Sequence, residues 1–128
     1  MKVYISLPIT GFDIEQVDAR CTFAVGVLKT KGHEAVNPLD VCGACGDELD
    51  YIGCIANDIN ALLRCDAVVM LDGWENSKGC QLERSAAQIY GLQVFDSLDK
   101  VPENAALWHV LEKEVCDEKQ IRANTIAF

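Results

Sequence analysis

AVVML-DGWEN-SKGCQLE, residues 67–83, is the stretch of the chain that decides the fold. The apolar residues 67–71 predict a buried strand, the polar residues 72–76 a loop, and the segment 77–83 the start of a helix that ends near Gly91. A strand, a polar loop and a helix N-terminus form a ligand-binding corner in parallel α/β sheets. Glu83 lies about a turn and a half into this helix, where a carboxylate can be held over the corner and used as a nucleophile.

The rest of the chain continues this alternation of strands and helices. Strands are predicted at 2–6, 33–36, 66–71 and 92–95. Helices are predicted at 14–31 (capped by Asp13 and ended by Gly32), 52–63, 77–90 and 103–116, with a loop over 39–50. Right-handed crossovers then give a parallel sheet with helices on both faces, and the strands 2–6 and 66–71 should be adjacent and central.

Length and charge narrow the class of protein. The chain has 128 residues, which predicts a single domain over 1–128, and its net charge of −9 disfavours nucleic acid and anionic membranes as partners. No apolar run approaches the roughly 18 residues of a membrane span, and residues 1–6 read as a strand and not as a signal peptide. We therefore expect a cytoplasmic protein.

The seven cysteines are an odd number, so we expect free thiols, with no disulfide and no bound zinc. Cys42-Gly43-Ala44-Cys45 leaves a metal or a redox site as alternatives. Cys54 would supply only a third zinc ligand, and no second CxxC or His pair follows. The two histidines lack a nearby nucleophile motif, and neither a P-loop nor a dinucleotide-binding fingerprint is present.

Four loops should meet at the carboxyl edge of the sheet, at 6–12, 37–50, 72–77 and 96–101. Glu83 either faces solvent, favoured there by the helix dipole, or borders a site beside the small residues Ala86 and Ala87. Asp58, on the helix over 52–63, is either solvated or aimed at the edge of the sheet.

The loop and helix start over 72–79 contain further candidate site residues, each of which also has a purely structural explanation. Ser77 is most simply an N-cap, which does not exclude a contact to a phosphate or hydroxyl. Gly79 would let a ligand approach the backbone, or serves only a tight turn. Trp74 could stack on a base or cover the core. Asp72 and Glu75 need no function in a polar loop.

Several of these segments resemble one known superfamily. Residues 3–11, VYISLPITG, resemble the opening "YISGPITG" of small nucleoside 2-deoxyribosyltransferase-like proteins of bacteria and phages. The segments Asn57-Asp58-Ile59 and 65–69, and the motif Ser77-x-Gly79-x-x-x-Glu83 with Ala87, match the same superfamily in order and spacing. The resemblance covers roughly residues 2–95.

The resemblance implies a flavodoxin-like fold, a three-layer α/β sandwich with a parallel sheet of four to five strands. It implies that Glu83 attacks C1′ of a (deoxy)ribosyl group and displaces the base, leaving a glycosyl ester that water or another base resolves. It places Asp58 near the sugar hydroxyls and Tyr4 near the sugar.

The sequence also departs from the motifs of the superfamily. Transferases commonly have Asp at the position of Ser77, whereas the related deoxynucleoside 5′-monophosphate N-hydrolases have a phosphate-binding Ser there. Those hydrolases carry a Ser and an Arg in the first loop, where this chain has Pro8 and Thr10, and Leu7 replaces a small Gly.

The sequence therefore predicts cleavage or transfer at the N-glycosidic bond of a nucleoside or nucleotide. Glu83 and Asp58 are the expected catalytic residues. The expected substrate-binding residues are Tyr4, Pro8, Gly11, Asp72, Trp74, Ser77 and Gly79. The alternative is a non-catalytic nucleotide-binding or sensing module on the same scaffold. The chemistry needs no metal or organic cofactor, and we expect a homodimer or higher homo-oligomer that completes its site across the interface.

Overall fold

The computed structural model describes residues 1–43 and 51–104. In these residues four strands form one parallel sheet, in the order β2-β1-β3-β4: β1 (Lys2–Ser6), β2 (Glu34–Val36), β3 (Ala67–Met70) and β4 (Gln93–Phe95). The predicted α/β class is confirmed, and so is the central pairing of β1 with β3, whose register joins Tyr4 to Val68 and Ser6 to Met70.

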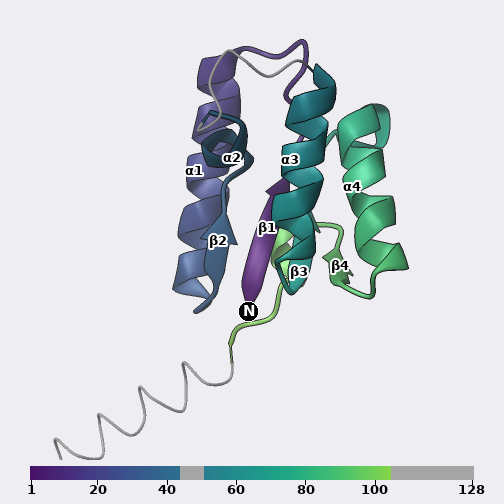
Figure 1. Ribbon diagram of the computed structural model, residues 1–128. Helices are drawn as coiled ribbons and strands as arrows, with labels where there is room; N and C mark the ends of the chain where they lie inside the picture. The colour runs from purple at the N-terminus through teal and green to yellow at the C-terminus, as the bar shows by residue number, and fades with distance from the viewer. Residues whose placement is uncertain (44–50, 105–128) are drawn as a thin grey trace, which may run out of the picture.

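Helices cover both faces of this sheet. Figure 1 shows α3 (Tyr51–Leu63) and α4 (Lys78–Ile89) side by side in front of the sheet, while α1 (Ile14–Thr30) packs against the opposite face. Asp13 caps α1 as predicted, its side chain accepting from the Glu15 amide at 3.0 Å. The result is the three-layer arrangement of a flavodoxin-like sandwich.

One predicted loop contains a helix. The short α2 (Pro38–Gly43) overlaps the start of the segment 39–50, for which the sequence predicts a loop. Asn37 begins it, because its side chain accepts from the Leu39 amide at 2.9 Å and Pro38 supplies a preset φ at the first helical position. Asn37 and Pro38 therefore end β2 and also start α2. Residues 44–50 lie outside the described residues.

The loops that follow β3 and β4 lie where the sequence predicts loops. The loops after β3 and β4 contain short 3₁₀ turns, η2 (Trp74–Asn76) and η3 (Leu98–Lys100). Most of the helix predicted over 103–116 lies outside the described residues. No helix in the described part of the chain is long and apolar enough to cross a membrane.

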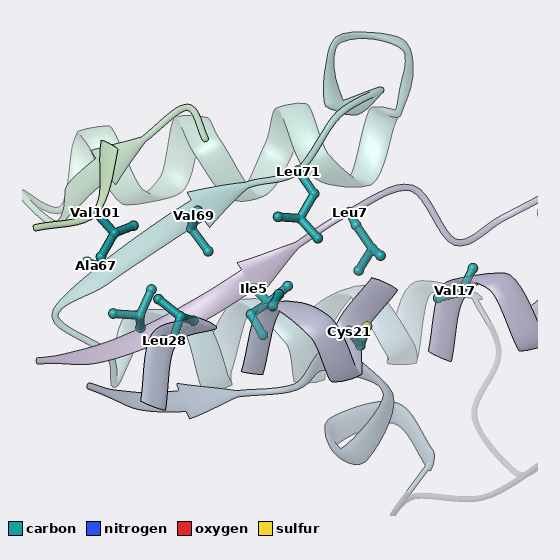
Figure 2. Packing of buried hydrophobic residues seen from close by; sticks show 11 residues of the cluster. Ile5, Leu7, Val17, Cys21, Leu28, Ala67, Val69, Leu71 and Val101 are labelled. Carbon is teal, nitrogen blue, oxygen red and sulfur yellow. The ribbon is translucent and has the colours of Figure 1, made fainter. Parts of the chain in front are cut away.

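The alternation of side chains on the strands sorts the core into two clusters. Figure 2 shows the cluster on the α1 face, where Ile5, Val69 and Leu71 from the sheet meet Cys21 and Leu28 of α1. On the α3 and α4 face the cluster contains Tyr4, Leu62, Cys65, Val68, Met70, Cys80 and Ala87. Tyr4 and Ser6 share this second face because residues two apart on a strand point the same way.

The strand order reverses direction between β1 and β3. The chain leaves β1 toward β2 on one side, and β3 and β4 then follow on the other. In open α/β sheets ligands bind outside the carboxyl ends of the strands at such a switch point. Ser6, the last residue of β1, lies at this position, and so does the loop that leads from β3 to α4.

Candidate active site

Glu83 faces the sheet and not the solvent. The buried residues of α4 are Cys80, Glu83 and Ala87, which follow helical spacing and form the face that packs on the strands. Glu83 is only 8% exposed although it carries an ionisable group. Buried carboxylates are rare unless their oxygens are hydrogen-bonded, so its partners are informative.

Each oxygen of the Glu83 carboxylate accepts one hydrogen bond from β1. The Tyr4 hydroxyl donates to Oε2 at 2.6 Å, and the Ser6 hydroxyl donates to Oε1 at 2.7 Å. Both donors are buried and both lie on a central strand. The carboxylate is therefore fixed in orientation at the carboxyl end of β1, next to the switch point.

Burial dominates the electrostatics of this group. Desolvation raises the pKa of Glu83 from 4.5 to about 7, the two hydroxyl donors oppose this rise, and the negative charge of Asp58 adds to it. Desolvation, then the charge of Glu83, also raise the pKa of Tyr4, which remains a neutral hydroxyl donor. Glu83 is thus poised to change its charge near neutral pH.

Asp58 of α3 is the second carboxyl group of the site. Desolvation raises its pKa from 3.8 to about 6, and its negative charge raises the pKa values of both Glu83 and Tyr4. Its Oδ1 is buried and has no hydrogen-bond partner among the described residues. A buried acceptor without a donor is a place for a ligand hydroxyl or a water molecule.

Ser77 caps α4 as predicted. Its hydroxyl accepts from the Cys80 amide at 3.3 Å, and its own backbone is extended. A Cβ built on Gly79 would meet only the Ser77 hydroxyl, at 3.9 Å, so packing among the described residues does not require glycine there. The space beside Gly79 is open, as the predicted approach of a ligand to the backbone requires.

The first loop and the loop after β3 contact each other. Gly73 has φ +93°, and a Cβ there would lie 3.2 Å from the Pro8 ring, so both the conformation and the contact require glycine. Arg20 of α1 donates to the Asp72 carbonyl at 2.8 Å, which holds the same loop from the other side. Gly11, with φ +85°, lies in the exposed part of the first loop, in a conformation that favours glycine.

The remaining candidates lie nearer the surface. The side chains of Asp72 and Glu75 are exposed, and the Glu75 carbonyl accepts from the Gln81 amide group. Trp74 packs against the cluster that contains Tyr4, while the Arg84 guanidinium lies over its ring, 4.8 Å from the centroid. The Arg84 guanidinium therefore covers one face of the indole. A base that stacks on Trp74 has only the uncovered part of the ring to contact.

Sequence reasoning missed two residues of this site. Ser6 was treated only as part of the first motif, although its position two residues after Tyr4 on the same strand predicts a shared face. Arg84 carried no signal in the sequence, because its partner Asp96 follows a different strand. Cys21, Cys65 and Cys80 are free thiols, and residues 44 and 45 of the Cys42–Cys45 motif lie outside the described residues.

Comparisons with known proteins agree with this fold. No curated protein matches the chain. Among solved structures, a CMP N-glycosidase from Clostridium botulinum is similar, with a TM-score of 0.50 and 20% sequence identity. The match covers 73% of this chain and 66% of that chain, and at this identity it shows a shared fold. Residues 1–96 match the family described as "Domain of unknown function (DUF4406)", and this chain therefore belongs to the DUF4406 family.

Proposed function

We propose that this protein cleaves or transfers at the N-glycosidic bond of a nucleoside or nucleotide, with Glu83 as the nucleophile. One observation carries the proposal: a buried carboxylate is held by Tyr4 and Ser6 at the switch point of a parallel sheet. The solved structure with the same fold is named as an N-glycosidase acting on CMP, which supports the reaction class and a nucleotide as substrate.

In the proposed reaction an oxygen of Glu83 attacks C1′ of the sugar. The C1′–N bond breaks, its electron pair leaves with the base, and the base takes up a proton. Water or a second base then attacks C1′ and gives up a proton, which replaces the proton taken up by the departing base; the ester bond to Glu83 breaks, and the carboxylate is restored. The transition state resembles an oxocarbenium ion, as in retaining glycoside hydrolysis, and the reaction needs no cofactor.

The other side chains have supporting roles in this scheme. The hydrogen bonds from Tyr4 and Ser6 orient Glu83 and favour its charged form. Asp58 offers its unpartnered Oδ1 to a sugar hydroxyl. Asp72 and Glu75 are exposed on the loop after β3, close in sequence to the start of α4. One of these two acids passes a proton to the departing base. Ser77 and Gly79 border the path of the ligand.

The direct test is a panel of nucleosides and 5′-monophosphates incubated with the protein and analysed for free base by chromatography. Release that requires an added second base identifies a transferase, and release in its absence a hydrolase. Thermal shift measurements on the same panel run alongside. Binding without any release would contradict the catalytic proposal and favour the alternative, a nucleotide-binding module.

Tyr4→Phe should move the pH dependence of base release to higher pH. The change keeps the ring in the core but removes a donor that lowers the pKa of Glu83. We expect the rising limb near pH 7 to shift upward by about one unit, and the rate near pH 6 to fall about tenfold. Rate–pH profiles of the two proteins measure this. Tyr90→Phe, at an exposed tyrosine just after α4, is the control, and a Tyr4→Phe profile that coincides with it would contradict the assignment.

The protein should form a dimer through α3 or α4. Ile52 on α3 and Leu82 and Ile89 on α4 are large apolar side chains that lie exposed along these two helices. Two-fold association would cover such residues and would add the walls that a small chain lacks around a nucleoside. Light scattering at micromolar concentration should give about twice the chain mass, and Ile89→Lys should lower it. A monomeric wild type would contradict this prediction.

A further inference from the structure

Arg84, the residue after Glu83 on α4, joins two loops at the carboxyl edge of the sheet. Its Nε lies 3.1 Å from Asp96 Oδ1 and its Nη2 lies 3.4 Å from Oδ2, so it engages both oxygens of this carboxylate. Asp96 follows β4 directly, and the Trp74 ring beneath the guanidinium belongs to the loop after β3. Figure 1 shows α4 beside β4, which brings the two loops within reach.

The indole of Trp74 is held from two directions by these contacts. It packs against the buried cluster that includes Tyr4 and Cys80, and the guanidinium lies over its ring at a cation–π distance. Asp96 fixes the plane of the guanidinium through the two-point contact, which a lysine could not reproduce. Tyr4, in the same cluster, donates to the carboxylate of Glu83. Trp74 is therefore held between Arg84 and the buried cluster to which Tyr4, the hydrogen-bond donor of Glu83, also belongs.

We propose that Arg84 and Asp96 are positioning residues that hold the Trp74 indole as a fixed wall of the substrate site. The part of the indole left uncovered is the surface that the aromatic base of the substrate contacts. Arg84 takes no part in bond cleavage, because successive helix residues point about 100° apart and its own charge is engaged by Asp96. This inference rests on the proposed function and identifies which residues set the affinity for the base.

Arg84→Lys tests the proposal, since it keeps the positive charge but loses the planar fork and the stacking. We expect KM for the best substrate of the panel to rise about tenfold while kcat changes by less than about twofold. Asp96→Asn should act in the same direction. The matched control is Arg64→Lys, because Arg64, exposed just after α3, donates from Nε to the exposed side chain of Asn60 at 2.9 Å, outside the site.

A measurement on Trp74 itself keeps the test independent of activity. Trp108→Phe leaves Trp74 as the single tryptophan, since the chain has two. In this background Arg84→Lys should raise acrylamide quenching of the Trp74 fluorescence about twofold by freeing one face of the ring. Arg64→Lys should leave the quenching unchanged. A circular dichroism spectrum equal to that of the wild type shows that the variant is folded.

The outcomes separate this proposal from the function on which it rests. Unchanged quenching in Arg84→Lys overturns it, and so does increased quenching with an unchanged KM. A fall in kcat with KM unchanged overturns it as well, since that would place Arg84 in the chemistry. If the wild type binds a nucleotide but releases no base, the proposed reaction is wrong. The Arg84→Lys test then uses the dissociation constant of that nucleotide in place of KM. A wild type that binds no member of the panel overturns both.

Discussion

Glu83→Gln should abolish base release while leaving the substrate bound. Glutamine keeps the size of the side chain, and its amide can accept from one of the Tyr4 and Ser6 hydroxyls and donate to the other, but it lacks the charge that attacks C1′. We expect the rate of release to fall by about a thousandfold or more, because a nucleophile contributes chiefly to the transition state. Binding should change by no more than about 1 kcal/mol.

The measurement is the rate of base release under single-turnover conditions, with the dissociation constant determined separately. Glu83→Ala should lose activity to a similar degree and remain folded. Glu34→Gln, at an exposed glutamate that begins β2, is the matched control and should behave as the wild type does. A covalent sugar adduct detected by mass spectrometry in the wild type and absent from Glu83→Gln would support the mechanism. Wild-type release by Glu83→Gln would rule it out.

The same substitution should stabilise the protein at high pH. The pKa of Glu83 is about 7 in the folded protein and 4.5 in the reference state, so between these values the folded state keeps a proton that the unfolded chain has lost. The free energy of unfolding therefore decreases as pH rises through this window. At about 1.4 kcal/mol per pKa unit, Glu83 accounts for a loss of up to about 3.5 kcal/mol above pH 7.

Glutamine carries no charge and escapes this loss. Urea unfolding should therefore show Glu83→Gln more stable than the wild type by about 2–3 kcal/mol near pH 8, with the difference shrinking toward zero below about pH 4.5. Asp58, whose pKa is also raised, is present in both proteins, so the difference between their profiles reports Glu83 together with its charge interaction with Asp58. Parallel profiles from about pH 4 to 8 would show that burial of this carboxylate carries no such penalty.

Together, loss of base release and a gain in stability in Glu83→Gln would show that Glu83 is needed for activity but lowers the free energy of unfolding. A buried carboxylate with a raised pKa destabilises the folded protein at neutral pH, and a neutral residue of the same shape would avoid this. Such groups concentrate at functional sites, where the perturbed pKa matches the chemistry. A loss of activity coupled to a gain in stability in one substitution would thus support a catalytic role for Glu83.

Much of the fold could be predicted from local patterns. The apolar run 67–71 and the strand 2–6 predicted two adjacent central strands, since strands buried on both faces are apolar throughout. Asp13 and Ser77 predicted the starts of α1 and α4, because N-caps act within a few residues. The helix α2 was missed because Asn37-Pro38 is compatible with the end of a strand as well as with the start of a helix.

Of the candidate site, the sequence by itself determined which residues are placed at the carboxyl edge. The order of strands, loops and helices put Glu83 beside the loop after β3, and the resemblance to the nucleoside 2-deoxyribosyltransferase-like superfamily related it to Asp58 and Tyr4. Whether Glu83 faces solvent or the sheet was left open, because helical periodicity does not say which face of α4 packs inward when Ala86 and Ala87 suit either one.

Only the tertiary structure decided what each of these side chains touches. Pairing of β1 with β3 and packing of α4 against them bring Tyr4 and Ser6 to within 2.6–2.7 Å of a carboxylate nearly eighty residues away. The same packing raises the pKa of Glu83 and leaves one oxygen of Asp58 without a partner. It also brings Arg84 into contact with Asp96 and Trp74. Burial and hydrogen bonding depend on groups distant in sequence, and their contacts exist only once the sheet has assembled and excluded water from its face.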